Sequence, residues 1–574
     1  MVRPLRFPVS AAFGSRPLAS LARVAAVALL AGAGFAAVAP ARGADGVVDL
    51  TILAINDFHG NLKPPAGGIK IPDPADPSKT ITVDAGGAEA MATLVKTERA
   101  KFPNSIFVAA GDLVGASPLL SALFADEPTV EALSLMGLEI SAVGNHEFDK
   151  GVVELLRKQN GGCGSDKSCL ALHPFLGAKY QYLAASTIDL KTGKPILPAY
   201  RIRSFEGVPV AFVGLTLKGT KDIVSPSGVA GVEFRDEAET INALVPELKA
   251  QGVEAIVVLI HEGGYATGDY NGCNGISGAI FDIIKKLDPA VRIVISGHTH
   301  QAYNCSIDGR LVTSGHRFGT LVTEIGVKLD RASKRIVEAK ADNMIVRTDT
   351  YAKDPDQTRL LDAYEKVAKP LADRPVGKIA ATLLKEAGPN GESPLGDVVA
   401  DGQLAATRDP DKGAAVIAVT NPGGIRTDLV KLREDGTVTY GDVFAAQPFG
   451  NNLVTMTLTG ADLKTMLEQQ WDGQPKPTIL QISKGFAYAW DEKRPVGDRV
   501  VPGSITLDGK PIEPAASYRV TMNNFLADGG DRFKVFKRGK DLLAGGADVD
   551  ALEAYLGAAG TLTPMPGERI RKVN

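Results

Sequence analysis

Short apolar runs alternate with amphipathic stretches through the first half of the 574-residue chain. The apolar runs predict buried β-strands at Val47–Ile55, Ser105–Ala110, Ile140–Val143, Val208–Leu215, Ile256–Ile260 and Arg292–Ser296. Helical spacing of apolar positions predicts helices at Leu119–Phe124, Thr129–Met136 and Ala238–Gln251. Strands that are apolar on both faces and are separated by helices indicate an α/β domain.

The pattern changes in the second half. Residues 341–350 have no strong periodicity. Asp354–Leu371 carries an apolar stripe among charged residues, which predicts a linking helix interrupted at Pro370 and capped near Asp354 or Asp356. Beyond it, short strands mix with predicted helices at Gly396–Ala406 and Gly460–Gln469. Since a chain of this length is expected to form two domains, we predict a first domain over residues 44–345, a linker over residues 346–375 and a second, α+β domain over residues 376–574.

The first 43 residues have the pattern of a secretory signal peptide. Several arginines precede an apolar stretch from Val24 to Val38, and small residues follow it. A retained membrane anchor is the alternative, but the stretch is short for a membrane span and rich in Ala and Gly. We therefore expect cleavage between Arg42 and Asp45, a periplasmic or secreted protein, and no stable membrane insertion after cleavage.

Four cysteines fit this expectation of export. An even number of cysteines in an exported chain suggests two disulfides. Three pairings are possible, and we favour Cys163 with Cys169 and Cys273 with Cys305. A thiolate metal site is the alternative, but the chain has no C-x-x-C spacing.

The net charge of -3 leaves no basic excess to neutralise a polynucleotide backbone, so no polynucleotide partner is expected. The seven histidines point to a different kind of site. All of them lie between His59 and His316, so a histidine-rich site must belong to the first half of the chain.

Polar motifs follow five of the predicted strands, at the point where each strand ends. They are Asp57 with His59, Asp112, Asn145 with His146, His261, and His298 with His300. Any one of them alone could be a turn residue or a satisfied polar group in the core. In open α/β sheets, however, binding sites form at the carboxyl ends of the strands. Five strands that each carry polar residues at this end therefore predict one shared site.

The side chains in these motifs suit divalent cations. Carboxylate and amide oxygens and imidazole nitrogens can ligate Mn, Zn, Co or Mg, and the residues do not decide between these metals. Asp57 and His59 are two residues apart, so they would share one face if the strand continued through them. Two cations roughly 3.5–4 Å apart can activate a water molecule and stabilise an in-line displacement at phosphorus.

His146 is expected to differ in role from its neighbour Asn145. Asp149 lies three residues further on, where a helical turn would bring its carboxylate to the imidazole. Such a pair keeps the ring charged and oriented, so that it can protonate a leaving oxygen or stabilise phosphoryl oxygens. The alternative is that Asp149 only caps the following helix.

Five segments together carry a resemblance to a known family. They are NDFHGNL at residues 56–62, GDLVGASP at 111–118, GNHEFDKG at 144–151, the strand-borne His261, and SGHTHQ at 296–301. The chain resembles the calcineurin-like metallophosphoesterases and, more narrowly, the 5'-nucleotidase family. The resemblance implies a four-layered α/β/β/α catalytic domain with a dinuclear metal centre. It assigns one ion to Asp57, His59, Asp112 and His300, the other to Asp112, Asn145, His261 and His298, and the catalytic dyad to His146 and Asp149. Some relatives carry Gln in place of His300, a difference that bears on metal preference.

Three patches of the second half are turn-like when taken alone. They are NPGGIR at residues 421–426, PFGNN at 448–452 and FLADGGD at 525–531. The resemblance implies that they bind a nucleoside, because aromatic rings stack on any base. It assigns base stacking to Phe449 and Phe525, a ribose contact to Asp531, a base contact to Asn421, and a phosphate or ribose contact to Arg426. Relatives carry a further arginine where this chain has Pro394, which leaves the binding of multiply charged phosphate tails open.

The function implied by the resemblance is that of an exported, metal-dependent 5'-nucleotidase. It would release phosphate from nucleoside 5'-monophosphates in nucleotide catabolism and extend to nucleoside di- and triphosphates or UDP-sugars. The alternatives among enzymes are a 2',3'-cyclic nucleotide phosphodiesterase/3'-nucleotidase and a thiosulfohydrolase. An alternative of another class is a periplasmic nucleotide-binding protein. The family also implies that the second domain rotates on a hinge at the linking helix.

Overall fold

The structure is a computed structural model that describes residues 46–164, 169, 174–226, 228–474, 476–564 and 567–574. The predicted signal peptide, residues 1–43, lies outside the described residues. Within those ranges, no helix combines the length and the apolar character that a membrane span requires.

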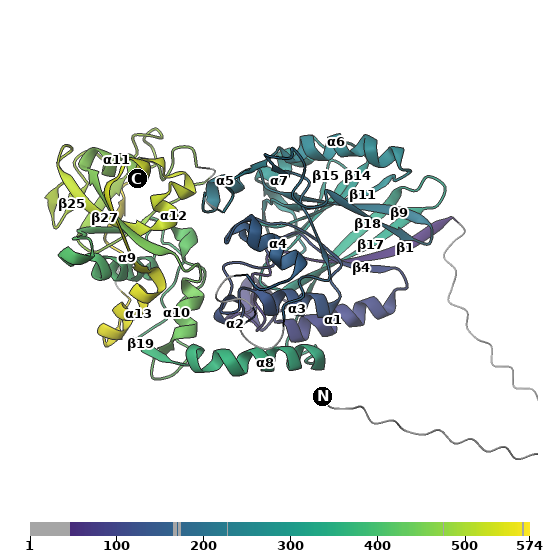
Figure 1. Ribbon diagram of the computed structural model, residues 1–574, viewed down its shortest axis with the longest axis horizontal. Coiled ribbons are helices and arrows are strands. Elements are labelled where there is room, and N and C mark those ends of the chain that lie inside the picture. Colours follow the sequence, from purple (N-terminus) through teal and green to yellow (C-terminus); the bar gives the residue numbers. More distant parts are fainter. Residues whose placement is uncertain (1–45, 165–168, 170–173, 227, 475, 565–566) are drawn as a thin grey trace, which may run out of the picture. The chain divides into compact units, whose positions relative to one another are not determined.

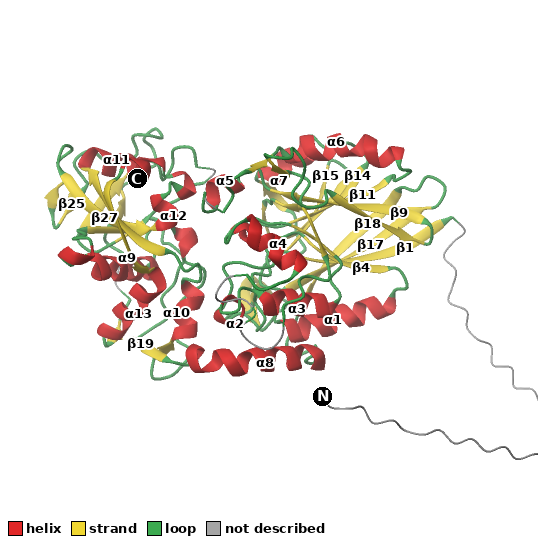
Figure 2. Ribbon diagram, in the orientation of Figure 1, coloured by secondary structure: helices red, strands yellow, loops and turns green. Residues whose placement is uncertain are grey.

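Two six-stranded β-sheets lie face to face in the first half of the chain (Figures 1 and 2). The first sheet has the order β18-β17-β1-β4-β5-β6, with bounds Ile336–Ile345, Leu321–Asp330, Val47–Ile55, Ser105–Ala109, Ile140–Ala142 and Gln181–Leu183. The second has the order β15-β16-β14-β11-β9-β8, with bounds Ala302–Ile307, Arg310–Gly315, Val291–Ser296, Ala255–His261, Val208–Thr216 and Tyr200–Phe205. All six predicted strands are present, within one or two residues of the predicted bounds.

The strands that precede the polar motifs run parallel within their sheets. β1 pairs with β4 and β4 with β5 in one sheet, and β11 pairs with β14 in the other. Parallel strands end at the same edge, so the residues that follow them meet there. Antiparallel strands flank these parallel ones: β17 and β18 lie on one side of the first sheet, and β15 and β8 are the two outermost strands of the second.

Helices cover the outer face of each sheet, which confirms the four-layered α/β/β/α arrangement. Alternate residues of β1 point to different layers, because side chains alternate along a strand: Leu50 and Ile52 pack between the sheets, whereas Leu53 and Ile55 pack under helices. Figure 1 shows these covering helices. They are α1 (Ala88–Lys101) and α3 (Glu127–Met136) on the first sheet, and α6 (Glu237–Ala250) and α7 (Ala279–Ile284) on the second.

β18 continues to Ile345, into the segment 341–350 where the sequence has no strong periodicity. β18 is an edge strand, and most of its side chains are at least partly exposed. Polar residues therefore occupy many of its positions, and the alternation of apolar residues that reveals a strand is weak there.

The predicted linking helix is α8 (Pro355–Ala372). The Asp354 side chain accepts hydrogen bonds from the backbone N–H groups of Asp356 and Gln357, so Asp354 is the cap. The predicted interruption at Pro370 is wrong, because the helix continues through it. Pro370 lies in the last turn, where the missing N–H removes a single hydrogen bond. The helix packs on the first half, with Tyr364 against Phe124.

The second half contains a five-stranded mixed sheet and several helices, as expected for an α+β domain. The sheet has the order β23-β20-β27-β22-β28, with bounds Gln481–Ile482, Ile417–Thr420, Ser517–Asn523, Asn452–Thr459 and Lys540–Ala547. The two predicted helices are α9 (Pro394–Thr407) and α11 (Gly460–Glu468). Further helices are α10 (Tyr440–Ala446), α12 (Asn524–Ala527) and α13 (Asp548–Ala558). Gly46–Asn574 forms one compact unit.

Two disulfides have the predicted pairing. Cys163 is bonded to Cys169, and Cys273 is bonded to Cys305 of β15. The second disulfide ties the loop before β13 (Asn274–Ser277) to the strand that follows the SGHTHQ motif.

Candidate active site

The predicted ligand residues come together at the carboxyl edge of the two sheets. Asp57, His59 and His300 place ligand atoms within 4.8 Å of one another, and Asp112, His261 and His298 do the same. The Nε2 atom of His59 lies 3.6 Å from the Asp112 carboxylate, which places Asp112 between the two groups. These groups contain six of the seven residues predicted to bind metal.

The seventh predicted ligand, Asn145, has a buried side-chain oxygen, Oδ1, without a hydrogen-bond partner. The same is true of Nε2 of His261. His261 Nε2 lies only 2.9 Å from Asp112 Oδ2, but without the geometry of a hydrogen bond. Buried polar atoms without partners are rare. Atoms that converge without bonding to one another fit ligands of a shared cation.

The ring nitrogens of two histidines are oriented by backbone carbonyl groups. Nδ1 of His59 lies 2.9 Å from the Gly115 carbonyl oxygen, and Nδ1 of His261 lies 2.8 Å from that of Ala110. Because a carbonyl only accepts, each Nδ1 must carry the proton, which leaves the Nε2 lone pair free when the ring is neutral. The residues present therefore fit divalent cations.

Asp57 and His59 lie beyond the end of their strand, so the condition under which they would share a strand face is not met. His261, by contrast, is the last residue of β11. β1 ends at Ile55, and Asp57 and His59 have φ values of 50° and 46°. Three other ligands, Asp112, His298 and His300, also have positive φ, at 50°, 71° and 56°. Left-handed backbone is uncommon outside glycine and is typical of functional sites. Sharp turns thus bring these side chains together.

Burial and neighbouring charges shift the pKa values of the site histidines in different directions. Burial lowers the pKa of His261, but the adjacent Asp112 carboxylate outweighs this effect and raises the pKa to about 10. Burial lowers the pKa of His298 to about 4, and the neighbouring His261 adds to this shift. His298 is therefore neutral and ready to bind metal, whereas His261 must release a proton as a cation binds.

Two supporting residues were not predicted from the sequence. The buried carboxylate of Glu147 accepts hydrogen bonds from the backbone N–H groups of Asp112, Leu113 and Gly144, at 3.0, 2.8 and 2.6 Å. It thereby ties two ligand loops together. The side-chain amide of Asn56 donates to Asp57 Oδ2 at 2.7 Å. The only signal for either residue is its place inside a motif, because both also bond to segments far away in the sequence, Glu147 to Asp112 and Asn56 to His316.

His146 and Asp149 form the predicted pair, with His146 Nδ1 2.8 Å from Asp149 Oδ2. A 3₁₀ turn at His146–Phe148 brings them together. The next helix, α4 (Val152–Asn160), has Gly151 as its N-cap and no side-chain cap, so the alternative role of Asp149 as a cap is not supported. Burial lowers the pKa of His146, but the carboxylates of Asp149 and Asp112 raise it above the usual value. The ring can therefore carry a proton to donate.

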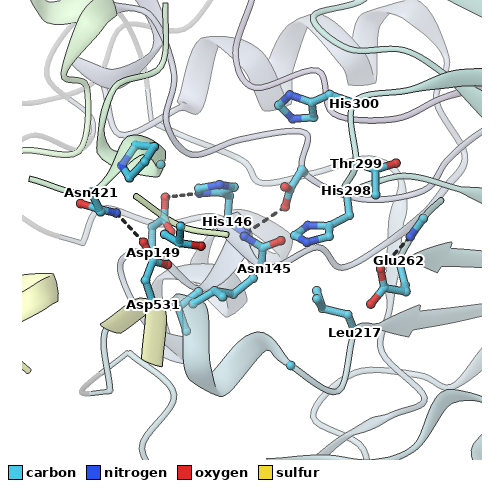
Figure 3. A pocket seen from close by; sticks show the side chains of 18 of the residues that line it. Asn145, His146, Asp149, Leu217, Glu262, His298, Thr299, His300, Asn421 and Asp531 are labelled. Carbon is cyan, nitrogen blue, oxygen red and sulfur yellow. Dashed lines mark hydrogen bonds and ion pairs between the residues drawn. The ribbon is translucent and has the colours of Figure 1, made fainter. Parts of the chain in front are cut away.

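One cavity of about 1200 Å³ joins this centre to the second half of the chain. All five residues predicted to bind substrate line it: Asn421, Arg426, Phe449, Phe525 and Asp531. Figure 3 shows Asn421 and Asp531 on one side of His146 and Asn145, with Glu262 and Leu217 on the other. The Asn421 side chain donates a hydrogen bond of 2.7 Å to Asp531 Oδ2.

The predicted aromatic pair is not in ring-to-ring contact. The Phe449 ring stacks instead on His146, with centroids 5.8 Å apart and planes 27° apart. Nη2 of Arg426 reaches the metal side, 3.3 Å from His59 Nε2. Pro394 opens α9 after the capping residue Ser393 and brings no positive charge to its segment.

The facing sheets and the ligand groups at their edge define a metallophosphoesterase. Residues 50–302 match the family model of the calcineurin-like phosphoesterases, and residues 375–538 match that of the 5'-nucleotidase C-terminal domain. The chain belongs to the 5'-nucleotidase family and is a metal-dependent phosphoesterase of that family.

Three relatives illustrate this membership. The chain is 34% identical to endonuclease YhcR of Bacillus subtilis over 89% of this chain and 40% of the relative. It is 30% identical to cell wall protein Lmo0130 of Listeria monocytogenes, over 90% of this chain and 68% of the relative. Among solved structures, a 5'-nucleotidase precursor from Thermus thermophilus matches with a TM-score of 0.74 and 26% identity, over 92% of this chain and 100% of that one. The chain thus spans less than half the length of the endonuclease.

Proposed function

We propose that this protein releases phosphate from nucleoside 5'-monophosphates with the help of two divalent cations. One observation carries the proposal: a single cavity is lined both by four of the candidate metal ligands, Asp112, Asn145, His298 and His300, and by residues suited to hold a nucleoside. One nucleotide could therefore place its phosphate at the metal side and its base at the other side of the same cavity. Nucleoside di- and triphosphates and UDP-sugars are further candidate substrates, because the cavity is large enough for groups beyond a monophosphate.

The metal ligands would divide into two sets that share one carboxylate. Asp57, His59, Asp112 and His300 would hold one cation, and Asp112, Asn145, His261 and His298 the other. The ions, for which Mn, Zn, Co and Mg are candidates, supply the Lewis acidity that activates water and stabilises charge at phosphorus. The unpartnered Asn145 Oδ1 and the grouping of ligand atoms within 4.8 Å support this division.

His146 would act on the substrate rather than on a cation. With Asp149 holding its Nδ1, the other ring nitrogen can protonate the leaving oxygen or hydrogen-bond to a phosphoryl oxygen. The ring lies near His59 and Asp112, which keeps it beside the reacting phosphate in this scheme.

The second half would hold the nucleoside. Phe449 and Phe525 would stack on the base, Asp531 would accept hydrogen bonds from the ribose hydroxyls, and Asn421 and Arg426 would contact base and phosphate. Since the Phe449 ring now stacks on His146, stacking on a base would require this ring contact to change. We propose that residues 376–574 move as a domain relative to residues 44–345, with residues 346–375 as the connector.

The decisive experiment is phosphate release from AMP after chelation and restoration of each metal. Release from AMP is expected with at least one metal and not after chelation. The substrate panel would include ADP, ATP, UDP-glucose and 2',3'-cyclic AMP. Preference for the cyclic nucleotide would favour the phosphodiesterase alternative. AMP binding without turnover in any metal would instead favour the binding protein.

We also propose export, with cleavage of residues 1–43. Two disulfides and a relative that is named a cell wall protein support it. Terminal sequencing of the protein recovered outside the cytoplasm should find a start between Arg42 and Asp45. Recovery of the full-length chain in the cytoplasm would contradict this proposal.

A further inference from the structure

Two arginines, Arg317 and Arg426, lie on either side of His59 and His300, two candidate metal ligands. Nη1 of Arg317 lies 3.4 Å from His300 Nδ1, and Nη2 of Arg426 lies 3.3 Å from His59 Nε2. The two Nε2 atoms of His59 and His300 are 3.2 Å apart. Only these two imidazoles therefore separate the guanidinium groups, and both arginines line the cavity.

Neither arginine has a carboxylate partner. Among the described residues, Arg317, Arg426 and the nearby Lys385 make no ion pair within 4.0 Å. Nε of Arg426 is enclosed and has no hydrogen-bond partner. Lys385 Nζ donates to the carbonyl oxygens of Ile425 and Arg426, at 3.3 and 3.1 Å. Partly buried charges without partners are costly, so this cluster favours an anionic ligand.

Arg317 is held in place before any ligand arrives. Its guanidinium lies over the Phe318 ring, 4.9 Å from the centroid. That ring in turn packs against His59 and His300, with centroids 6.0 and 5.8 Å apart. A guanidinium with a fixed plane is suited to bidentate recognition of phosphate. Carboxylates do lie nearby without forming an ion pair: Asp57 and Asp428 act on Arg317, and Asp112 acts on Arg426. Asp428 accepts a hydrogen bond from the backbone N–H of Lys385 at 2.8 Å.

We propose that Arg317, together with Arg426, forms a subsite for a second phosphate group that adjoins the phosphate under attack. This proposal rests on the proposed function, because it assumes that the first phosphate lies at the cations. It assigns nucleoside di- and triphosphates, and not only monophosphates, to the cavity. Arg317 would bring a positive charge to the cavity from the first half of the chain, whereas Pro394, at the position of the family's further arginine, brings none.

The test compares ADP with AMP in wild type and Arg317→Gln. Loss of charge-assisted hydrogen bonds to the second phosphate should raise the ratio of KM for ADP to KM for AMP roughly 10- to 100-fold. Arg317→Lys keeps the positive charge but loses the planar guanidinium that can donate two parallel hydrogen bonds, so it should raise this ratio of KM values less. Arg347→Gln is the matched control, because Arg347 pairs with Asp349 on the surface, and it should leave the ratio unchanged.

Equal losses on AMP and ADP, or no change on either, would overturn the subsite. Calorimetric titration of metal-loaded enzyme with pyrophosphate and with inorganic phosphate gives a second measurement. Arg317→Gln should weaken pyrophosphate binding roughly tenfold more than phosphate binding, and equal effects on both would also overturn it. If wild type hydrolyses neither nucleotide, the proposed function fails, while the titration still decides the subsite. Thermal unfolding of each variant separates these outcomes from loss of the fold.

Discussion

The metal side and the nucleotide side of the cavity are built in different ways. Asp57, His59 and His261 are fully buried at the ends of parallel strands. Backbone hydrogen bonds link the loops that carry them, such as Asp57 N–H to Gly111 and His59 N–H to Asp112. Phe449 and Phe525, by contrast, are half-buried and lie on segments of the second half. Backbone hydrogen bonds thus hold the metal side together, whereas the proposed stacking on a base would require new contacts on the nucleotide side.

This difference implies a division of labour. Substitutions on the metal side should affect every phosphate ester alike, because the attacked phosphorus is common to them all. Substitutions on the nucleotide side should affect only substrates that carry a base. Among the described residues, the stacking of Phe449 on His146 is the one contact between two rings that crosses between the two sides. The predictions below test whether the division holds.

The largest effect is expected from Asp112→Asn. Asp112 lies between both ligand groups, so the variant should lose cations and at least about 100-fold of turnover, since even residues that only support metal ligands typically cost 10- to 100-fold. The loss should be the same for AMP and for p-nitrophenyl phosphate. Metal content by mass spectrometry and steady-state kinetics would measure it. Asp349→Asn, on the surface, is the matched control, and two bound ions with normal turnover in Asp112→Asn would break the assignment.

His146→Ala should come next, with kcat lowered by about 10²- to 10⁴-fold and KM little changed. The reason is that the ring is proposed to act on the phosphoryl group in the transition state rather than to bind the nucleoside. Asp149→Asn should have a smaller effect of the same kind, because it only holds the ring. Initial rates at saturating and at limiting AMP separate kcat from KM. Near-normal kcat in His146→Ala would show that the role is wrong.

The same division governs what the sequence could predict. Asp57, Asp112 and His298 were found because each follows a buried strand, a pattern that a single chain displays. The linking role of Glu147 was missed, because it depends on three backbone N–H groups from two loops. Arg317 was missed for a different reason. Its significance comes from a residue of the other half of the chain, Arg426, and no short-range pattern records such a meeting.

The sequence predicted buried strands well but did not predict the left-handed turns that follow them. Buried strands such as β11 were predicted within one residue, because all of their positions are apolar. The left-handed turns at Asp57 and His300 were not predicted, since no glycine marks them. A strained residue held by tertiary contacts leaves no mark in local propensity. The sequence therefore identified the candidate ligand residues but not the backbone conformation that orients their side chains.

The double variant Phe449→Ala with Phe525→Ala tests the nucleotide side. If both rings stack on the base, KM for AMP should rise by roughly 5- to 100-fold, from the 1–3 kcal/mol typical of base stacking. Hydrolysis of p-nitrophenyl phosphate, which has no base, should be much less affected. Equal losses on both substrates would instead mean that the Phe449–His146 contact supports the chemistry, and the two sides would not be separable.

The smallest effect is a pH dependence at Asp531. Burial raises the pKa of this carboxyl to about 6, although the Asn421 hydrogen bond and the charge of Arg532 lower it. At pH 8 the ionised carboxylate would accept hydrogen bonds from the ribose hydroxyls in the proposed complex, and at pH 5 the protonated carboxyl would lose this advantage. Asp531→Asn cannot titrate, so its KM for AMP should exceed that of wild type by about fivefold at pH 8 and approach it at pH 5. Because titration of the AMP phosphate is common to both proteins, it cancels in the ratio of their KM values. A ratio that stays constant between pH 5 and pH 8 would remove Asp531 from the ribose site and leave its bond to Asn421 as its only role.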